Sequence, residues 1–213
     1  MPNPSIPHRL SQYLLACWLA VVTLGILILE AHSARSGEEG SPPTQWPATT
    51  ELVLDRAKPT LLIFVHPRCP CSRASVAELS QVLSRGGGRI SVHAVIYRPK
   101  QAPEGWSRAD LGIEQSLASL SMVEVHDDLE GREARCFGVS TSGHVLLFDP
   151  AGRRIFEGGI TASRGHEGEN RGCEEVIALI QGSGETRENL ARSAPPVFGC
   201  PIVTPKTPFG ETD

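Results

Sequence analysis

One pair of cysteines constrains the fold of this chain more than any other feature. Cys69-Pro70-Cys71 follows an apolar run at residues 60–65 (TLLIFV), and apolar residues then recur at helical spacing over residues 71–84. At the N-terminus of a helix, free backbone N–H groups and the positive end of the helix dipole favour the thiolate over the thiol. The pattern therefore predicts a buried strand, a turn that carries reactive thiols, and an amphipathic helix.

Further strand and helix patterns alternate along the rest of the chain. We expect strands over residues 90–97, 122–125, 145–148 and 154–157, a short strand within residues 46–54, and helices over residues 110–120, 129–137 and 173–181. Asp110 is placed to cap the first of these three helices. The last two strands are predicted to form an antiparallel hairpin, because the turn at residues 149–152 is too short for a parallel crossover. This order of elements predicts an α/β fold with a mixed central sheet flanked by helices.

The composition narrows the class of protein. The chain has 213 residues, of which 40% are hydrophobic and 21% charged, and its formal net charge is −4. These values suit one globular domain with additional segments, and the lack of a basic excess argues against a nucleic-acid partner. The six cysteines are too few for a disulfide scaffold and lack the paired spacing of a zinc site. We therefore predict a single domain without a cofactor.

The N-terminal part of the chain contains an uncharged apolar stretch. Residues 13–29 carry no charged side chain, and their 17 residues reach the lower limit of a membrane span. His8 and Arg9 precede the stretch, and acidic residues dominate the segment that follows it. By the positive-inside rule, residues 1–12 are predicted to be cytoplasmic and the main part of the chain periplasmic or otherwise extracytoplasmic. We expect an uncleaved transmembrane anchor; a signal peptide cleaved after Ser33 is the alternative.

The remaining chain divides into three parts. Residues 30–47 are polar and rich in proline and glycine, which is typical of a linker. Residues 48–182 hold the strand and helix patterns and form the predicted domain. Residues 183–213 are predicted to be an irregular tail, in which the run PPVFGCPI at residues 195–202 places an apolar patch and Cys200. The chain is thus expected to be one extracytoplasmic domain tethered to a membrane.

Three segments carry a resemblance to a known family. They are FVHPRC at residues 64–69, DDLEGREARCFGV at residues 127–139 and VLLFDPAGR at residues 145–153. Over residues 48–182 the chain resembles the thioredoxin-like superfamily, and within it the membrane-anchored TlpA/ResA-type thiol-disulfide proteins. The His-Pro pair before Cys69 and the TSGH segment at residues 141–144 are also similar to the proteins labelled RedB. The resemblance implies a thioredoxin-like fold and thiol-disulfide exchange with protein disulfide or dithiol substrates.

The chain departs from the family pattern at two positions. The family motif is Cys-x-x-Cys, but an ungapped comparison puts Ser72 at the second thiol and Cys71 where the family has a proline. The family also has a cis-proline before the strand that faces the thiols, and Gly143 stands at that position. Because a cis peptide before glycine is costly, we expect this loop to be built differently, with Gly143 and His144 facing the substrate.

The motif and the resemblance together assign candidate roles. Cys69 is expected to attack a substrate disulfide, with Arg68 and Arg73 stabilising its thiolate. Cys71 is expected to resolve the mixed disulfide, although a Cys-x-Cys disulfide closes a small, strained ring. Cys200 is the second candidate for the resolving thiol, because the tail is long enough to fold back towards the motif.

Three other functions fit parts of the same pattern. Cys69, Cys71 and His144 would suit copper in the manner of SCO-type delivery proteins, which share the thioredoxin fold but space their cysteines more widely. A peroxiredoxin would need a threonine where this chain has His66. The third alternative is a redox-inert interaction domain. We predict the oxidoreductase, with no bound metal, over these alternatives.

Overall fold

The computed structural model describes residues 8–101, 112–182 and 194–203. The chain falls into two compact units, Met1–Arg35 and Ser36–Asp213. The first unit contains helix α1 (His8–Ser33), whose segment Arg9–Ser33 is long and apolar enough to cross a membrane. This helix includes the predicted span at residues 13–29. A signal sequence near an N-terminus has the same length and composition.

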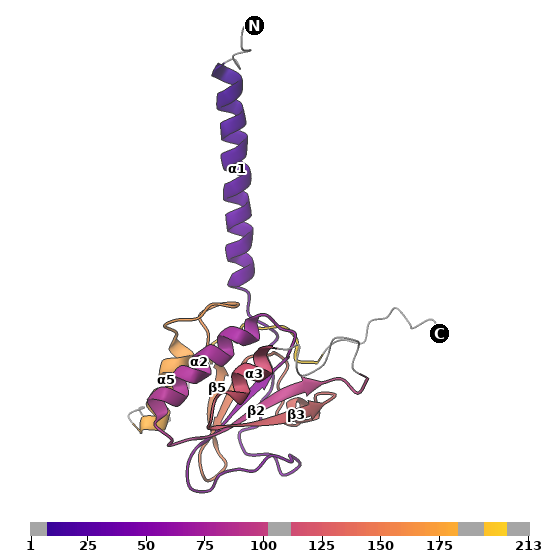
Figure 1. Ribbon diagram of the computed structural model, residues 1–213, viewed down its shortest axis with the longest axis vertical. Coiled ribbons are helices and arrows are strands. Elements are labelled where there is room, and N and C mark those ends of the chain that lie inside the picture. Colours follow the sequence, from indigo (N-terminus) through magenta and orange to yellow (C-terminus); the bar gives the residue numbers. More distant parts are fainter. Residues whose placement is uncertain (1–7, 102–111, 183–193, 204–213) are drawn as a thin grey trace, which may run out of the picture. The chain divides into compact units, whose positions relative to one another are not determined.

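A five-stranded mixed sheet, formed by described residues, is the centre of the second unit (Figure 1). Its strands are β1 (Thr60–Val65), β2 (Ser91–Arg98), β3 (Val123–Leu129), β4 (His144–Phe148) and β5 (Arg154–Gly159), in the order β3-β2-β1-β4-β5. Strand β2 runs parallel to β1 and β3, while β4 runs antiparallel to β1 and β5. The mixed sheet, flanked by helices, confirms the predicted thioredoxin-like fold.

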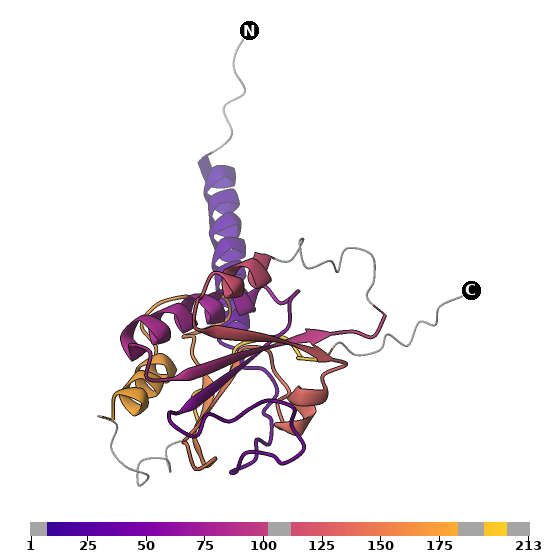
Figure 2. The same ribbon diagram turned by 60° about the horizontal axis from the view of Figure 1, so that its bottom comes forward.

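Helices cover both faces of this sheet (Figure 2). Those in the described residues are α2 (Cys71–Gly86), α3 (Gly112–Ala118), α4 (Arg132–Cys136) and α5 (Arg171–Gln181). On one face, Ile63 and Val65 of β1 pack in a core with α2, α3 and α5. On the other face, Leu62 and Phe64 pack with Phe137, which follows α4. Strand β1 is apolar from Leu61 to Val65 because both of its faces are buried.

One predicted boundary between strand and helix is wrong. Strand β3 extends to Leu129, so the helix predicted to start there begins only at Arg132. The cause is the buried Asp128. Its carboxylate accepts hydrogen bonds from the backbone N–H groups of Glu133 and Ala134 (2.8 and 3.0 Å), which holds a turn between β3 and α4.

Residues 46–54 form no strand, contrary to the expectation from their apolar pattern. Leu52 and Leu54 are nevertheless buried, and Trp46 packs edge-on against two buried phenylalanines. Apolar side chains therefore anchor this segment to the domain without a ladder of backbone hydrogen bonds. Asp110, which was expected to cap a helix, lies outside the described residues.

Much of the segment predicted as a linker belongs to the folded unit. The Gly37 N–H donates to the Val197 carbonyl, and the Ser41 N–H donates to the Gly138 carbonyl, both at 2.8 Å. Packing is close here, because a Cβ at Gly40 would lie 2.2 Å from the Gly138 carbonyl oxygen. The chain is thus tied to the domain from the beginning of the second unit, ahead of the boundary that composition suggests.

We expect Leu147→Ala to destabilise the protein strongly. Leu147 is fully buried in β4, and removing a buried leucine side chain costs about 2–5 kcal/mol. Urea denaturation of the full chain in detergent, followed by circular dichroism, measures the free energy of unfolding. Val53→Ala is the matched control: the Val53 side chain is 74% exposed, so the change should stay within about 0.5 kcal/mol. Equal effects of the two substitutions would contradict the assigned core.

Candidate active site

The two motif cysteines lie where the turn after β1 becomes helix α2. The backbone N–H of Cys69 donates to the His66 carbonyl (3.0 Å), and Pro70 precedes the first helical residue, Cys71. Pro70 suits this place, because it has no N–H to leave unpaired and its φ of −62° matches a helical start. Both cysteines are largely buried: 3% of Cys69 and 8% of Cys71 is exposed.

Ser72 stands where the family motif has its second thiol, and it ties the turn to the loop before β4. Its hydroxyl is fully buried, donates to the His66 carbonyl (3.2 Å) and lies 2.7 Å from the Ser142 hydroxyl. The Ser142 hydroxyl in turn accepts a hydrogen bond from the His66 N–H (2.8 Å). These bonds fix the turn against the loop. Because Ser72 has no thiol, any disulfide partner of Cys69 must be another residue.

The C-terminal segment at residues 195–202, here named the strap, packs against the same loop. Its backbone pairs antiparallel with the loop: the Ser142 N–H donates to the Cys200 carbonyl (2.8 Å), and the Ile202 N–H donates to the Ser140 carbonyl (2.9 Å). The Ile202 side chain is buried. The predicted irregular tail therefore contains an ordered segment, held in the way that a sheet holds an added strand.

Two glycines permit this close packing. A Cβ at Gly199 would lie 1.9 Å from the Ser142 carbonyl oxygen, a contact that no side chain could make. Gly143, at the position of the family's cis-proline, has a φ of 87°, and its N–H donates to the Phe64 carbonyl (2.7 Å). The described residues contain no cis peptide bond. The loop before β4 therefore differs from the family pattern through a glycine in a left-handed conformation.

The strap brings a third thiol to the motif. The Sγ atoms of Cys69 and Cys200 are 3.0 Å apart, although these residues are separated by 131 positions in the sequence. The Cys71 thiol also hydrogen-bonds to Cys69. Cys69 thus lies between two thiols, one from the first residue of α2 and one from the strap, and none of the three is in a disulfide.

The pKa of Cys69 lies below its usual value. Burial alone would raise the pKa, but several hydrogen bonds to the sulfur outweigh it. They come from the thiol and the backbone N–H of Cys200, from the Ser72 hydroxyl and from the backbone N–H of Cys71. Cys69 is therefore the thiol of this group that most readily loses its proton.

The pKa values of the two neighbouring thiols move in the other direction. Burial, and then the Cys69 sulfur, raise the pKa of Cys200 to about 12 and also raise the pKa of Cys71. Arg164, from the segment between β5 and α5, partly offsets these effects by lowering both pKa values, and it hydrogen-bonds to Cys71. When one of the three thiols loses its proton, that thiol is therefore Cys69.

An arginine outside the motif contacts a thiol. Arg68 and Arg73 line a cavity of about 300 Å³ beside Cys69, whereas the guanidinium that bonds to Cys71 is that of Arg164. Arg164 lies in an irregular, glycine-rich segment between a strand and a helix, where no periodic pattern predicts its contact with the motif.

His144, predicted to face the substrate, is buried, and neither ring nitrogen has a hydrogen-bond partner among the described residues. Burial, and then the charge of Arg154, lower its pKa to about 4. The ring lines a cavity of about 500 Å³ together with the strap and residues 36–42. In the described parts of the chain no hydrogen bond joins His144 to Cys69 or Cys71, so the copper ligand set stays a prediction.

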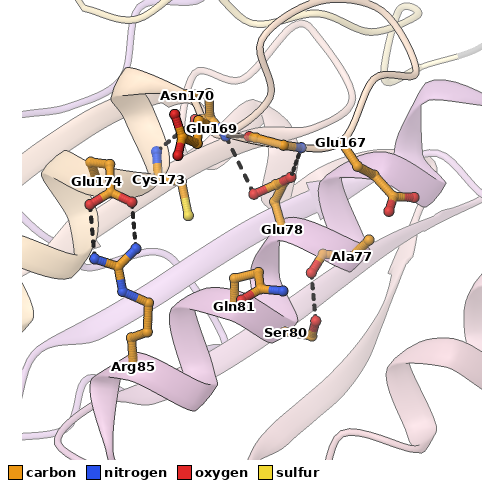
Figure 3. Close-up of a pocket in the computed structure, with 11 residues that line it drawn as sticks. Ala77, Glu78, Ser80, Gln81, Arg85, Glu167, Glu169, Asn170, Cys173 and Glu174 are labelled. Carbon is orange, nitrogen blue, oxygen red and sulfur yellow. Dashed lines mark hydrogen bonds and ion pairs between the residues drawn. The ribbon is translucent and has the colours of Figure 1, made fainter.

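A separate cavity of about 480 Å³ lies between α2 and α5 and contains Cys173 (Figure 3). Burial, and then the neighbouring Glu78 carboxylate, raise the pKa of Cys173 to about 12. The Glu78 carboxylate accepts hydrogen bonds from the Gly168 N–H (2.6 Å) and from the side-chain amide of Asn170 (3.4 Å). The Cys173 thiol therefore stays protonated at neutral pH.

The likeness of this chain to known proteins is a likeness of fold, not of sequence. No protein-family model and no curated protein matches the sequence. A hypothetical protein from Sinorhizobium meliloti 1021 is similar in structure (17% identity, TM-score 0.54, 80% of this chain and 94% of that one). So is an uncharacterized conserved protein from Geobacillus kaustophilus (16% identity, TM-score 0.55, 81% and 94%). A secreted Mycobacterium tuberculosis disulfide oxidoreductase has a TM-score of 0.41 at 18% identity, over 61% of this chain and 84% of its own.

We expect acidification to destabilise the protein through His144. Because its pKa of about 4 in the folded protein lies below the ordinary 6.5, the unfolded chain binds more protons between these pH values. The free energy of unfolding should therefore fall as the pH drops from 6.5 towards 4, by up to ~3 kcal/mol from this residue. His144→Leu should keep the stability at neutral pH and remove this part of the pH dependence.

Urea unfolding of both proteins across this pH range checks the expectation. Part of the slope should persist in His144→Leu, because burial also lowers the pKa values of His66 and His93. His166→Ala is the control, since His166 is exposed. A slope in His144→Leu equal to that of the wild type would show that His144 does not cause the pH dependence.

Proposed function

We propose that the protein is a membrane-anchored, extracytoplasmic thiol-disulfide oxidoreductase that acts on protein disulfides or dithiols. The observation that carries this proposal is the meeting of Cys69, Cys71 and Cys200 at the N-terminus of α2. One pKa in this group is lowered and two are raised, which separates an attacking thiol from two thiols that wait in protonated form. Three cysteines that served only to fill the core would not need pKa values that differ in this way.

The reaction begins with the Cys69 thiolate. It attacks one sulfur of the substrate disulfide, so that a bond forms between Cys69 and that sulfur while the disulfide bond breaks. The other substrate sulfur leaves as a thiolate and takes a proton from solvent. Arg68 and Arg73 line the cavity beside Cys69 and would stabilise this leaving thiolate, which gives them a role at the substrate.

Formation of the mixed disulfide prepares the second attack. In the reduced protein, burial and then the Cys69 sulfur raise the pKa values of Cys71 and Cys200. Once Cys69 is bonded to the substrate it carries no charge, while Arg164 continues to lower both pKa values. A waiting thiol then loses its proton and attacks the Cys69 sulfur, which releases the substrate thiol. Two electrons have passed from the protein to the substrate, and the protein retains a disulfide.

Cys200 is the resolving thiol that the geometry favours. Its sulfur lies 3.0 Å from that of Cys69, so a small movement brings the two to bonding distance. Cys71 would close a Cys-x-Cys ring, whose dihedral angle departs from the relaxed value. The motif alone points to Cys71, which is therefore the alternative resolving thiol.

The proposed location is supported by helix α1. His8 and Arg9 begin this helix, and its segment Arg9–Ser33 is apolar enough to span a bilayer. The positive-inside rule places such an N-terminus in the cytoplasm and the second unit outside it. Disulfides persist outside the cytoplasm, so exchange chemistry suits that compartment.

Copper binding is the second candidate function. The observation that favours it is the third thiol, because thiolates are soft ligands that select copper(I). Copper would need the same sulfur atoms as the exchange reaction, so the two functions exclude one another at any moment and can be told apart by experiment.

We expect Cys69→Ser to abolish the two-electron oxidation of the full chain in detergent across a series of glutathione potentials. Cys200→Ser should remove the main disulfide, while Cys71→Ser should retain it, because the contact between Cys69 and Cys200 favours that pair. Mass spectrometry after alkylation identifies the bonded cysteines. Cys173→Ser is the matched control at a thiol that stays protonated, and it should oxidise like the wild type.

Other outcomes of this experiment are equally decisive. A disulfide lost in Cys71→Ser but kept in Cys200→Ser would assign the resolving role to Cys71. The oxidoreductase proposal is rejected if the thiols never oxidise and instead bind one copper(I) ion per chain, with affinity that Cys69→Ser removes.

We expect Cys200→Ala to raise the pKa of Cys69, because alanine removes a hydrogen-bond donor from its sulfur. Cys200→Ser keeps a hydroxyl donor at the same place and should raise the pKa less. The pH dependence of the rate at which iodoacetamide modifies Cys69 measures the change in the full chain. If the pKa of Cys69 is equal in the wild type and Cys200→Ala, the strap does not stabilise the thiolate.

A further inference from the structure

Two histidines and a glutamate meet on one face of the sheet. His93 lies on β2, and Glu124 and His126 lie on the neighbouring strand β3. The parallel register pairs His93 with Glu124 and places His126 beside Val95, so the three side chains project from the same face. The cluster is thus a product of strand register.

The donor atoms of these three side chains converge. His93 Nδ1 lies 2.8 Å from His126 Nε2. Oε2 of Glu124 lies 3.4 Å from His93 Nδ1, and Oε1 of Glu124 lies 3.6 Å from His126 Nε2. Ligands of a tetrahedral zinc ion lie about 2.0–2.1 Å from the metal and hence about 3.3 Å from one another. With one carboxylate oxygen as the ligand, the three donor atoms lie within 4.8 Å of one another, and the imidazoles would have to part by about 0.5 Å.

The buried His93 is oriented by a backbone contact. Its Nε2 lies 3.0 Å from the Val53 carbonyl, to which it must donate, and this leaves the Nδ1 lone pair directed at the cluster. A carbonyl that accepts from the second ring nitrogen is the usual support of a metal-binding histidine. Without a metal, His126 Nε2–H donates to this lone pair, and a shift of that proton to the other nitrogen of His126 frees Nε2 for a metal.

The cluster is accessible from solvent on one side. The side chain of His93 is 4% exposed, whereas those of His126 and Glu124 are 26% and 67% exposed. An ion can therefore reach the donor atoms, and its outer side remains available to water.

We propose that His93, Glu124 and His126 bind one Zn²⁺ ion, with water in the fourth position. Imidazole and carboxylate are ligands that zinc accepts, and three protein ligands with one open position are typical of accessible zinc sites. The site uses no thiol, so it stands independently of the proposed exchange reaction.

Co²⁺, which substitutes for Zn²⁺ and absorbs visible light, tests this site in the full chain in detergent. The parent protein carries Cys69→Ser, Cys71→Ser and Cys200→Ser, so that the thiol cluster cannot bind the ion. We expect one Co²⁺ per chain, displaced by Zn²⁺, with visible absorption bands and without the ultraviolet charge-transfer band of a thiolate ligand.

In this parent, His126→Ala and Glu124→Gln should each weaken Zn²⁺ binding at least about tenfold. Both side chains are partly exposed, so the metal-free variants should melt at the temperature of the parent. His166→Ala, which changes an exposed histidine outside the cluster, should bind as the parent does. Zn²⁺ should also raise the melting temperature of the parent and of His166→Ala, with a much smaller rise in His126→Ala.

Three results would overturn the assignment. Co²⁺ binding that both substitutions leave unchanged would place the metal elsewhere. A thiolate charge-transfer band would assign it to one of the remaining cysteines. A parent that binds no Co²⁺ would show that the cluster is a hydrogen-bonded histidine pair and nothing more.

Discussion

Strand β1 is the constraint on which the rest of the structure depends. Its six residues are buried, its two edges pair with β2 and β4, and its two faces belong to different cores. A shift of one residue would exchange the side chains of the two cores and draw polar flanking residues into the sheet, so the register is fixed. The end of β1 is therefore a fixed point. The turn that starts at His66 carries Cys69 from that point to a defined place at the start of α2.

The choice of resolving thiol decides which way electrons flow. A Cys69–Cys200 disulfide would close a loop spanning 131 positions, which in the chain-entropy account stabilises the folded state by about 4–5 kcal/mol. A disulfide that stabilises the fold resists reduction, so its reduced form is a good electron donor. A Cys69–Cys71 disulfide would gain little from loop closure and would be strained, which makes it an oxidant. Resolution by Cys200, as proposed, would therefore make the protein a reductase, whereas resolution by Cys71 would make it an oxidase.

Sequence patterns predict those parts of the fold that are determined by residues close together in the chain. The apolar run of β1, the periodic face of α2 and the short turn of the last hairpin each have their own pattern, and the structure has them where the pattern indicates. The strap has no such pattern, because its order comes from backbone bonds to Ser142 and from the missing side chain of Gly199. At the site, the place of Cys69 follows from its neighbours in sequence. The contact between Arg164 and Cys71 depends instead on which distant loop lies over the turn. The cluster at His93 depends on the register of β2 and β3, which the periodicity of the sequence does not reveal.

The sheet keeps the thiols of the motif apart from the imidazoles of the proposed zinc site. His93 pairs with Leu62, three residues before the end of β1, which is about 10 Å along the strand before the turn to Cys69 begins. No single ion can be shared over such a length of rigid sheet, so the thiols and the imidazoles act as separate sites. Zn²⁺ also binds thiolates, and the reduced motif would compete for it. Oxidation removes those thiolates but leaves the register of β2 and β3 untouched. The redox state of the thiols should therefore set how many metal ions the chain binds, while the cluster at His93 binds its ion in either state.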